Sequence, residues 1–374
     1  MSNFLLEKLQ TRIDQGNLRS LQTKKKGLID FSSNDYLGLA RSDLFLKVVL
    51  QEWEKLHDTK KHLGSTGSRL LTGNSIYAEK LEDKIAAFHG FATGTLFSCG
   101  YMANLGLFSA ITTYKDIIIF DANIHASSRD GMKLSAANSY PFRHNDLDHL
   151  ERRLKTLKCA GKRFICIESI YSTDGSKAPL REISELTKKY EAHLIVDEAH
   201  AIGVEGPSGK GLISECNLTE DVFALIATFG KALGVFGAII LGSSALKKAL
   251  LNFARPLIYT TALPLHNLSV ISCSYDIFPK MEQERIHVKN LSEILKKSRI
   301  STSDTAIHGL IIKGSDRIKK IVNLLEIDGY DVRALLSPTV QKNHEVLRIS
   351  LHAFNTSEDT IKLTKKIHDL CLIS

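Results

Sequence analysis

The sequence predicts an α/β protein with a mostly parallel central sheet flanked by helices, followed by a smaller C-terminal α+β domain. Apolar runs of strand length recur and end in polar residues, at 93–98, 117–120, 164–168, 194–196, 222–229 and 237–242. Helical periods lie between them, as in 76–88 and 183–190. Strands that alternate with helices favour a parallel sheet. From about residue 275 the pattern changes to helices with short strands, such as 306–312 and 347–351.

The domain organisation follows from the same patterns. The chain has 374 residues, of which 43% are hydrophobic, enough for two or three domains or one large domain with appendages. We predict an N-terminal arm (1–45), a large α/β domain (46–275) and a small C-terminal α+β domain (276–374). Residues 1–18 have the pattern of an amphipathic helix rather than a signal peptide, because charged residues interrupt the apolar ones.

Composition favours some classes of protein over others. The net charge of +8 is scattered, with only Lys24–Lys26 and Lys60–Lys61 as small runs. A solvated surface therefore explains it better than nucleic-acid binding. The six cysteines show no CxxC pair or zinc spacing, which predicts free thiols and no metal site. No apolar run reaches transmembrane length, so we expect a cytoplasmic protein with no membrane partner.

Lys231 lies in a glycine-flanked turn between two apolar strands. A lysine in such a position is costly unless it is paired, exposed or chemically used. Glycine at 230 and 234 allows a tight turn and a close approach to a bound group. The stretch alone leaves two interpretations open: a lysine on a surface loop, or a reactive lysine that forms an imine.

Polar residues follow several of the predicted strands. His125, Ser172 and the pair Asp197 and His200 come after three of them. In open α/β sheets, ligands bind beyond the carboxyl ends of the strands. Asp197 after a buried strand needs a cation, and a protonated pyridine nitrogen is suitable. The DEAH box of a helicase is disfavoured because no GxxxxGK[ST] loop precedes it.

Two further features indicate anion binding. Gly100 and Tyr101 stand at a strand-to-helix turn, where free backbone N–H groups favour an anion, although a plain core helix explains them equally well. Arg348 lies within an apolar strand, where it requires a carboxylate or phosphate ligand or an internal salt bridge. The glycine-rich loop at 64–74 can approach a ligand closely but lacks the lysine of a phosphate loop.

Taken in order, these motifs resemble those of the α-oxoamine synthases, pyridoxal-phosphate (PLP) enzymes of fold type I. The resemblance covers essentially the whole chain and rests on residues 33–39, 64–74, 100–104, 121–127, 197–200, 228–231 and 347–348. It implies a homodimer with a shared active site. The irregular segments 33–39, 64–74 and 259–262 favour the same assembly, because they hold apolar residues without a regular period.

The resemblance also implies a role for each site residue. Lys231 would carry PLP covalently, Asp197 would pair with the ring nitrogen, His200 would bind the phenolic oxygen and His125 would stack on the ring. The phosphate would be held by Gly100, Tyr101 and Thr228, with Thr260 or Thr261 reaching the phosphate bound by the partner subunit. Ser172 would lie near the cofactor oxygens. Substrate would be bound by Asn34 and Arg348, with Arg19 as the loose match to an acyl-binding arginine.

The loop at 64–74 and the segment 255–261 resemble the family member that condenses L-alanine with a pimeloyl thioester in biotin synthesis. The acyl group would be carried on coenzyme A or on an acyl carrier protein. Glycine C-acetyltransferase, serine palmitoyltransferase and 5-aminolevulinate synthase share most motifs and stay open as alternatives. A non-enzymatic, basic nucleic-acid-binding protein would require Lys231, Asp197 and Arg348 all to be incidental.

Overall fold

The computed structural model describes residues 3–21, 23, 26–56 and 63–373. Contacts divide the chain into two compact units. We call residues 35–171 and 177–285 the sheet unit, and residues 1–34, 172–176 and 286–374 the C-terminal unit. Of the basic runs noted above, Lys24, Lys25 and Lys60–Lys61 lie outside the described residues.

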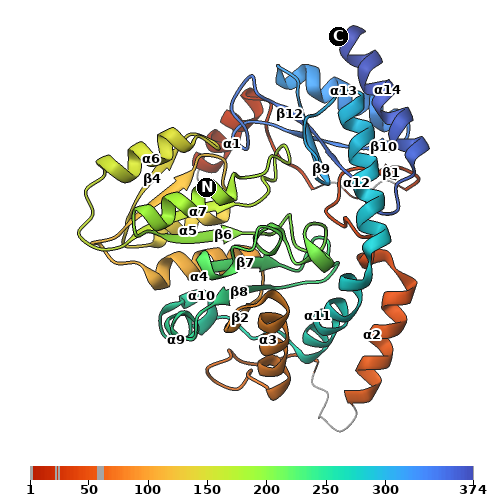
Figure 1. Cartoon of the computed structure of the whole chain (residues 1–374). Helices are drawn as coiled ribbons and strands as arrows, with labels where there is room; N and C mark the ends of the chain where they lie inside the picture. The colour runs from red at the N-terminus through yellow and green to blue at the C-terminus, as the bar shows by residue number, and fades with distance from the viewer. Residues whose placement is uncertain (1–2, 22, 24–25, 57–62, 374) are drawn as a thin grey trace. The chain divides into compact units, whose positions relative to one another are not determined.

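The sheet unit is built on a seven-stranded sheet of order β2-β8-β7-β6-β5-β3-β4 (Figure 1). Its strands are β2 (Thr93–Phe97), β3 (Ile117–Asp121), β4 (Asn138–Phe142), β5 (Arg163–Glu168), β6 (His193–Asp197), β7 (Val222–Thr228) and β8 (Ala238–Gly242). Strands β3 to β7 pair in parallel, and β8 pairs antiparallel with both neighbours. The inner strands are buried almost throughout, as their continuous apolar runs require. The predicted mostly parallel sheet is confirmed.

Helices pack along this sheet, with α3, α4, α6, α7 and α9 in contact with its strands. The helices of the unit are α2 (Asp43–Lys55), α3 (Ile76–His89), α4 (Gly100–Ile111), α5 (Ala126–Leu134), α6 (Leu147–Thr156), α7 (Leu180–Lys189), α8 (Leu212–Glu215), α9 (Ser244–Phe253), α10 (Arg255–Ile258) and α11 (Leu265–Ile277). Helix α3 begins where the Ser75 hydroxyl accepts a hydrogen bond from the Ala78 backbone N at 3.1 Å, and it ends at the left-handed Gly90.

Two local features differ from the sequence patterns. The sequence patterns predict no helix in the segment 255–261, but residues Arg255–Ile258 form the short helix α10. Pro256 in the first turn explains this, because its fixed φ suits a helix start. Strand β4 is the second feature. It contains Pro141 and is mostly exposed, which is tolerated because β4 is an edge strand.

The C-terminal unit contains a three-stranded antiparallel sheet of order β11-β12-β9 and the short parallel pair β1-β10. The strands are β1 (Ile29–Asp30), β9 (Ile307–Ile311), β10 (Tyr330–Asp331), β11 (Arg333–Leu335) and β12 (Val346–Ser350). The helices are α1 (Phe4–Asp14), α12 (Glu282–Lys297, of which 286 onward belongs here), α13 (Ser315–Ile327) and α14 (Ser357–Ile373). Within the part of the chain that the structure describes, no helix has the length and apolarity to cross a membrane.

Residues 29–34 join the C-terminal unit through its strands. The Phe31 backbone N donates to Asp331 O at 2.9 Å, and its carbonyl accepts from the Ser350 backbone N at 2.8 Å. Residues of the predicted arm are therefore shared between the two compact units, which divide between Asn34 and Asp35. The domain limits at 45 and 275 stay a prediction.

One buried carboxylate joins three parts of the sheet unit. Glu82 on α3 is 0% exposed and accepts hydrogen bonds from the Arg69 guanidinium, from Leu96 N at 2.8 Å and from Lys247 Nζ at 2.9 Å. It thereby ties the 64–74 loop and helix α9 to strand β2. Arg69 also donates to Asn74 Oδ1 at 2.7 Å, within the same loop.

Replacing Glu82 with alanine is expected to lower the free energy of unfolding by about 3 kcal/mol, because Arg69 and Lys247 lose their shared counter-charge in a buried place. Urea denaturation measures this as a fall in the midpoint. Glu79→Ala is the matched control: Glu79 lies on the same helix, is exposed and bonds only to Asn74 among the contacts described. Equal midpoints for the two variants would contradict the structural role of Glu82.

Candidate active site

Lys231 lies in the turn that follows β7, at the edge where the parallel strands β3, β5, β6 and β7 have their carboxyl ends. The turn is closed by a hydrogen bond from Phe229 N to Gly237 O at 2.9 Å. Gly234 has a left-handed φ of 68°, and a Cβ there would lie 2.5 Å from the Ala40 backbone N. Only glycine fits this position, so the turn presents the half-buried Lys231 in a defined place.

Lys231, His200 and Tyr36 form a connected cluster. Nζ of Lys231 lies 2.8 Å from Nε2 of His200, whose Nδ1 lies 2.7 Å from the hydroxyl of Tyr36. His200 and Tyr36 are 6% and 0% exposed. Tyr36 comes from the irregular segment 33–39, so this segment orients the histidine that sequence analysis assigned to the phenolic oxygen of the cofactor.

Asp197 ends β6 and is 6% exposed. Its Oδ1 accepts from the Ala199 backbone N at 3.0 Å, and its Oδ2 accepts from Nδ2 of Asn104 at 3.1 Å. Both donors are neutral, so they orient the carboxylate without cancelling its charge. A carboxylate held in this way suits a cationic ring nitrogen.

His125 lies just before α5, at the carboxyl end of β3. Its backbone N donates to Oε1 of Glu168, and its Nδ1 lies 2.7 Å from the Ser127 hydroxyl. Desolvation and the positive charge of Lys231 lower the pKa of His125, while Asp197 and Asp130 act in the opposite direction. The imidazole is therefore neutral at pH 7, which suits stacking against a ring.

Glu168, which sequence analysis did not assign to the site, pairs in register with Asp197 across β5 and β6. It is 3% exposed. Burial, followed by the negative charge of Asp197, raises the pKa of Glu168 to about 8. Since an exposed glutamate ionises near pH 4.5, the folded cofactor-free protein binds more protons than the unfolded chain between these two values.

The contribution of Glu168 to the stability of the cofactor-free protein is therefore expected to become less favourable as pH rises from about 4.5 to 8, because burial penalises its ionised form. Glu168→Gln keeps an oxygen that accepts from His125 N and removes the ionisation. We expect this variant to lose less stability than the unaltered protein over the same range in urea melts at several pH values. Parallel stability-pH curves for the two proteins would contradict the prediction.

The start of α4 has the features of a phosphate site. Its N-cap residue, Cys99, makes no side-chain hydrogen bond to the first turn, which leaves backbone N–H groups for a ligand. A Cβ on Gly100 would lie 2.4 Å from Cγ2 of Thr228. Oγ1 of Thr228 is buried without a hydrogen-bond partner among the described residues. Helix α4 has 12 residues, and its first turn has no side-chain cap. The unpartnered Thr228 hydroxyl beside this N-terminus therefore fits a phosphate group. Tyr101 follows and donates its hydroxyl to Asp130.

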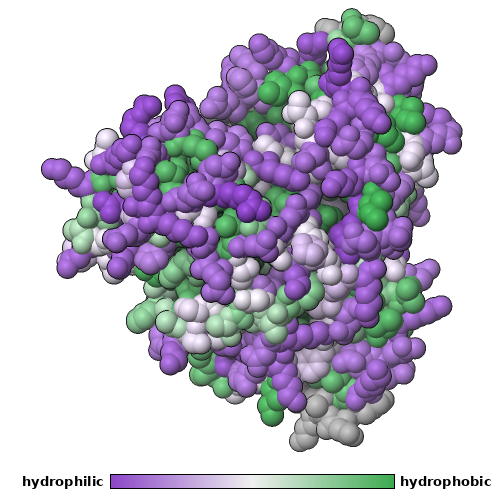
Figure 2. All heavy atoms as spheres, viewed as in Figure 1, coloured by the Kyte–Doolittle hydropathy of each residue, from purple (hydrophilic) through white to green (hydrophobic). Residues whose placement is uncertain are grey.

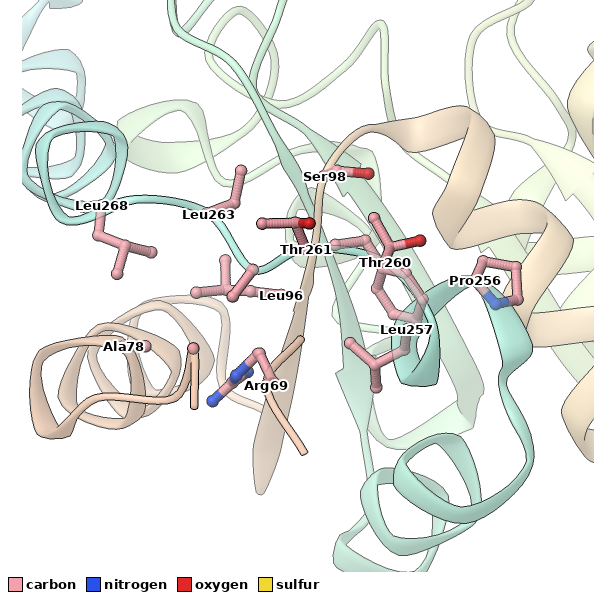
Figure 3. A pocket seen from close by; sticks show the side chains of 13 residues that line it. Arg69, Ala78, Leu96, Ser98, Pro256, Leu257, Thr260, Thr261, Leu263 and Leu268 are labelled. Carbon is pink, nitrogen blue, oxygen red and sulfur yellow. The ribbon is translucent and has the colours of Figure 1, made fainter. Parts of the chain in front are cut away.

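Thr260 and Thr261 line a pocket in the sheet unit, together with Arg69, Ser98 and neighbouring apolar residues (Figure 3). Ser98 immediately precedes Cys99 and the start of α4. The glycine-rich loop and the segment of the two threonines meet here, through a β-bridge of Ser68 with Thr261 and a 3.0 Å hydrogen bond from Ala262 N to Gly67 O. No described hydrogen bond joins the threonines to the Lys231 cluster, and their role toward a phosphate bound by a partner subunit stays a prediction.

Arg348, Asn34 and Ser172 come together in the C-terminal unit. Arg348 is 9% exposed. It donates Nε to Ser172 O at 2.7 Å, Nη2 to Asn34 Oδ1 at 2.9 Å and Nη1 to Ser350 Oγ at 2.8 Å. These three acceptors are neutral groups, and they hold the guanidinium in a defined orientation. Arg19 is exposed. The predicted ligand-binding roles of all four residues (Arg19, Asn34, Ser172 and Arg348) stay predictions.

Sequence analysis missed four residues that the structure brings to the site: Tyr36, Asn104, Ser127 and Glu168. Two of them carried a signal in the sequence. Glu168 ends an apolar strand as Asp197 does, and Asn104 lies one helical turn after Gly100. For Ser127 and Tyr36, only the fold shows which histidine each side chain contacts.

The sheet topology, the position of Lys231 after β7 and the buried Asp197 are those of a fold type I transferase that uses PLP. Residues 26–367 match the family model described as aminotransferase class I and II, and the chain belongs to this family. Among its curated relatives is the 8-amino-7-oxononanoate synthase of Emericella nidulans, 37% identical, with 98% of this chain and 95% of the relative covered. A putative 8-amino-7-oxononanoate synthase of Neisseria gonorrhoeae is 36% identical, with 93% and 92% covered.

Solved structures confirm the predicted fold. Serine palmitoyltransferase from S. paucimobilis superposes with a TM-score of 0.88 at 24% identity, covering 99% of this chain and 97% of that chain. The 8-amino-7-oxononanoate synthase of Francisella tularensis gives a TM-score of 0.79 at 26% identity, covering 93% and 99%. The predicted resemblance to α-oxoamine synthases and the predicted PLP cofactor are both confirmed.

Proposed function

We propose that this protein condenses L-alanine with a pimeloyl thioester, releasing CO2 and the free carrier thiol to give 8-amino-7-oxononanoate in biotin synthesis. The observation that carries the proposal is the similarity to proteins of that name at 35–37% identity over more than nine-tenths of the chain. The geometry of the sheet unit supports the same reaction class, because Lys231 lies 2.8 Å from His200 at the edge of the sheet where β6 ends in the buried Asp197.

When bound, PLP supplies an electron sink for a carbanion at the amino acid α-carbon. Lys231 would hold the cofactor covalently, and its Nζ would take up the α-proton and return it. Asp197 would keep the ring nitrogen protonated, and His200 would donate a hydrogen bond to the phenolic oxygen. Arg348 would bind the amino acid carboxylate.

The balance of the reaction is simple. The α C–H bond breaks, a C–C bond forms to the thioester carbonyl carbon and the thiol leaves with a proton. The substrate carboxylate then departs as CO2, and a proton takes its place at the α-carbon. No oxidant or reductant is required, in agreement with a site built from proton-transferring and charge-orienting groups.

Another α-oxoamine synthase activity is the second candidate, because serine palmitoyltransferases share the fold along almost the full length of the chain. A substrate panel decides between the two. Alanine, glycine and serine are each tested with pimeloyl, acetyl, succinyl and palmitoyl thioesters, on coenzyme A and on acyl carrier protein. We expect alanine with a pimeloyl thioester to have the highest kcat/KM, and preference for any other pair would overturn the proposal.

We also propose that the active site is completed by a second copy of the chain. Leu70, Leu71, Ile76 and Tyr259 are exposed by 50%, 81%, 72% and 70%, and each lies within two positions of a residue that lines the pocket with the threonines. Exposed apolar side chains of this kind are typical of an interface. On the face drawn in Figure 2, hydrophobic residues are likewise exposed between hydrophilic ones.

Complementation tests this assembly. Lys231→Ala and a Thr260→Ala, Thr261→Ala double variant are each expected to be strongly impaired. After subunit exchange, mixed dimers should regain activity in one of their two sites, because each chain supplies what the other lacks. As a control, Lys231→Ala mixed with Asp197→Ala should regain nothing, since these residues serve the same site from one chain. A fully active monomer in sedimentation experiments would refute the shared site.

A further inference from the structure

A chain of three hydrogen bonds joins Asp197 to His125 inside the sheet unit. Asn104 on α4 donates Nδ2 to Oδ2 of Asp197 at 3.1 Å and to Oγ of Ser127 at 3.0 Å. Ser127, on α5, lies with its hydroxyl 2.7 Å from Nδ1 of His125. Asn104 and Ser127 are 2% and 1% exposed, so bulk water does not compete for these bonds.

The direction of each hydrogen bond follows from the donors and acceptors available. An ionised carboxylate only accepts, so the amide of Asn104 must face Asp197 with its nitrogen. The second Nδ2 hydrogen then goes to Ser127 Oγ, and the Ser127 hydroxyl hydrogen is left for Nδ1 of His125. The Ser127 backbone N also points to Nδ1, at 3.3 Å, and can only donate. Nδ1 is therefore an acceptor, and the proton of neutral His125 lies on Nε2.

We propose that Asn104 and Ser127 are positioning residues that couple the carboxylate at the cofactor ring nitrogen to the imidazole at the ring face. Through them, the orientation of Asp197 determines the tautomer and the tilt of His125. The proposal rests on the roles proposed above for Asp197 and His125, and it does not depend on which thioester is the substrate. The carbonyl oxygen of Asn104 is buried without a hydrogen-bond partner among the described residues, so the amide nitrogen alone anchors this side chain by hydrogen bonding.

The relay has a consequence for the charge of His125. Protonation of His125 at Nδ1 would place an N–H group against the hydroxyl and the backbone N–H of Ser127, which both donate to Nδ1. The chain of hydrogen bonds therefore disfavours the protonated imidazole. Desolvation and Lys231 act in the same direction, whereas Asp197 and Asp130 favour the charged ring. Removing the Ser127 hydroxyl should therefore raise the pKa of His125.

The test compares Ser127→Ala with Ser128→Ala. Ser128 is the next residue on α5, is also 1% exposed and takes no part in the chain of hydrogen bonds. Histidine 15N NMR, with the His125 signals assigned by His125→Gln, reports the tautomer and the pKa of the ring with and without PLP. In the unaltered protein we expect the Nε2–H form. In Ser127→Ala we expect a raised pKa and about fivefold weaker PLP binding by fluorescence titration, while Ser128→Ala matches the unaltered protein.

A second variant tests the hydrogen bond between Asn104 and Asp197, at the other end of the chain of hydrogen bonds. Asn104→Leu keeps the side-chain volume and removes both donors, so the absorbance of bound PLP should shift toward that of an unprotonated ring and PLP should dissociate more readily. If Asn104→Leu does not fold, the Ser127 result decides alone. An Nδ1–H tautomer in the unaltered protein, or a Ser127→Ala protein with unchanged His125 pKa and PLP affinity, would overturn the proposal. Failure of the substrate panel would leave both readouts intact, so the two hypotheses fail separately.

Discussion

Replacing Lys231 with alanine is expected to abolish the covalent attachment of PLP and to reduce turnover by at least about 10²–10⁴-fold, the range for loss of a positioned proton-transfer group. The expectation follows from the place of Lys231 in a rigid turn at the carboxyl edge of the sheet, 2.8 Å from His200. The measurement is borohydride reduction of the holoprotein followed by peptide mapping of the labelled lysine, alongside steady-state kinetics.

Lys210→Ala is the control for this experiment. Lys210 is also a lysine of the sheet unit, but its ammonium group lies over the ring of Phe88, 5.1 Å from the ring centroid. This variant should retain the label and the activity. A retained label on another lysine in the Lys231→Ala protein would show that the cofactor is bound elsewhere.

The second large effect is expected at Asp197. Asp197→Asn keeps an oxygen for the Ala199 backbone N and a side chain of the same shape, yet removes the negative charge. Turnover should fall by about 10²–10³-fold, because loss of one preorganised electrostatic group has this magnitude. We expect the variant to fold, although the amide nitrogen that replaces Oδ2 would face the Nδ2 donor of Asn104 and weaken that contact.

Comparing Asp197→Asn with Asp197→Ala distinguishes the effect of the negative charge from the effect of the side-chain shape and its hydrogen bonds. If the charge is what matters, Asn and Ala variants should be impaired alike, and both should bind PLP with an altered absorbance spectrum. If only Asp197→Ala is impaired, the carboxylate serves as a structural acceptor instead. Near-normal turnover in both variants, with circular dichroism unchanged, would remove Asp197 from the reaction.

Much of the site could be predicted because it obeys local rules. Buried parallel strands are continuous apolar runs, so the sequence indicates where each strand ends. Polar residues at these ends mark the carboxyl edge of the sheet. Lys231, Asp197 and His125 were predicted in this way, and Lys231 and His200 do lie in contact. The tight turn at Gly234 could be predicted because few residues other than glycine accept its left-handed backbone conformation.

The tertiary structure decided what depends on contacts between distant residues. Asn104 meets Asp197 across 93 positions of sequence, and Tyr36 meets His200 across 164. No periodicity records such a pair, because each side chain is by itself an ordinary core or loop residue. The antiparallel direction of β8 and the exposed edge strand β4 were hidden for a related reason. Strand direction and edge position are properties of the whole sheet, set by the packing of all its strands, whereas apolar patterning records only how deeply each strand is buried.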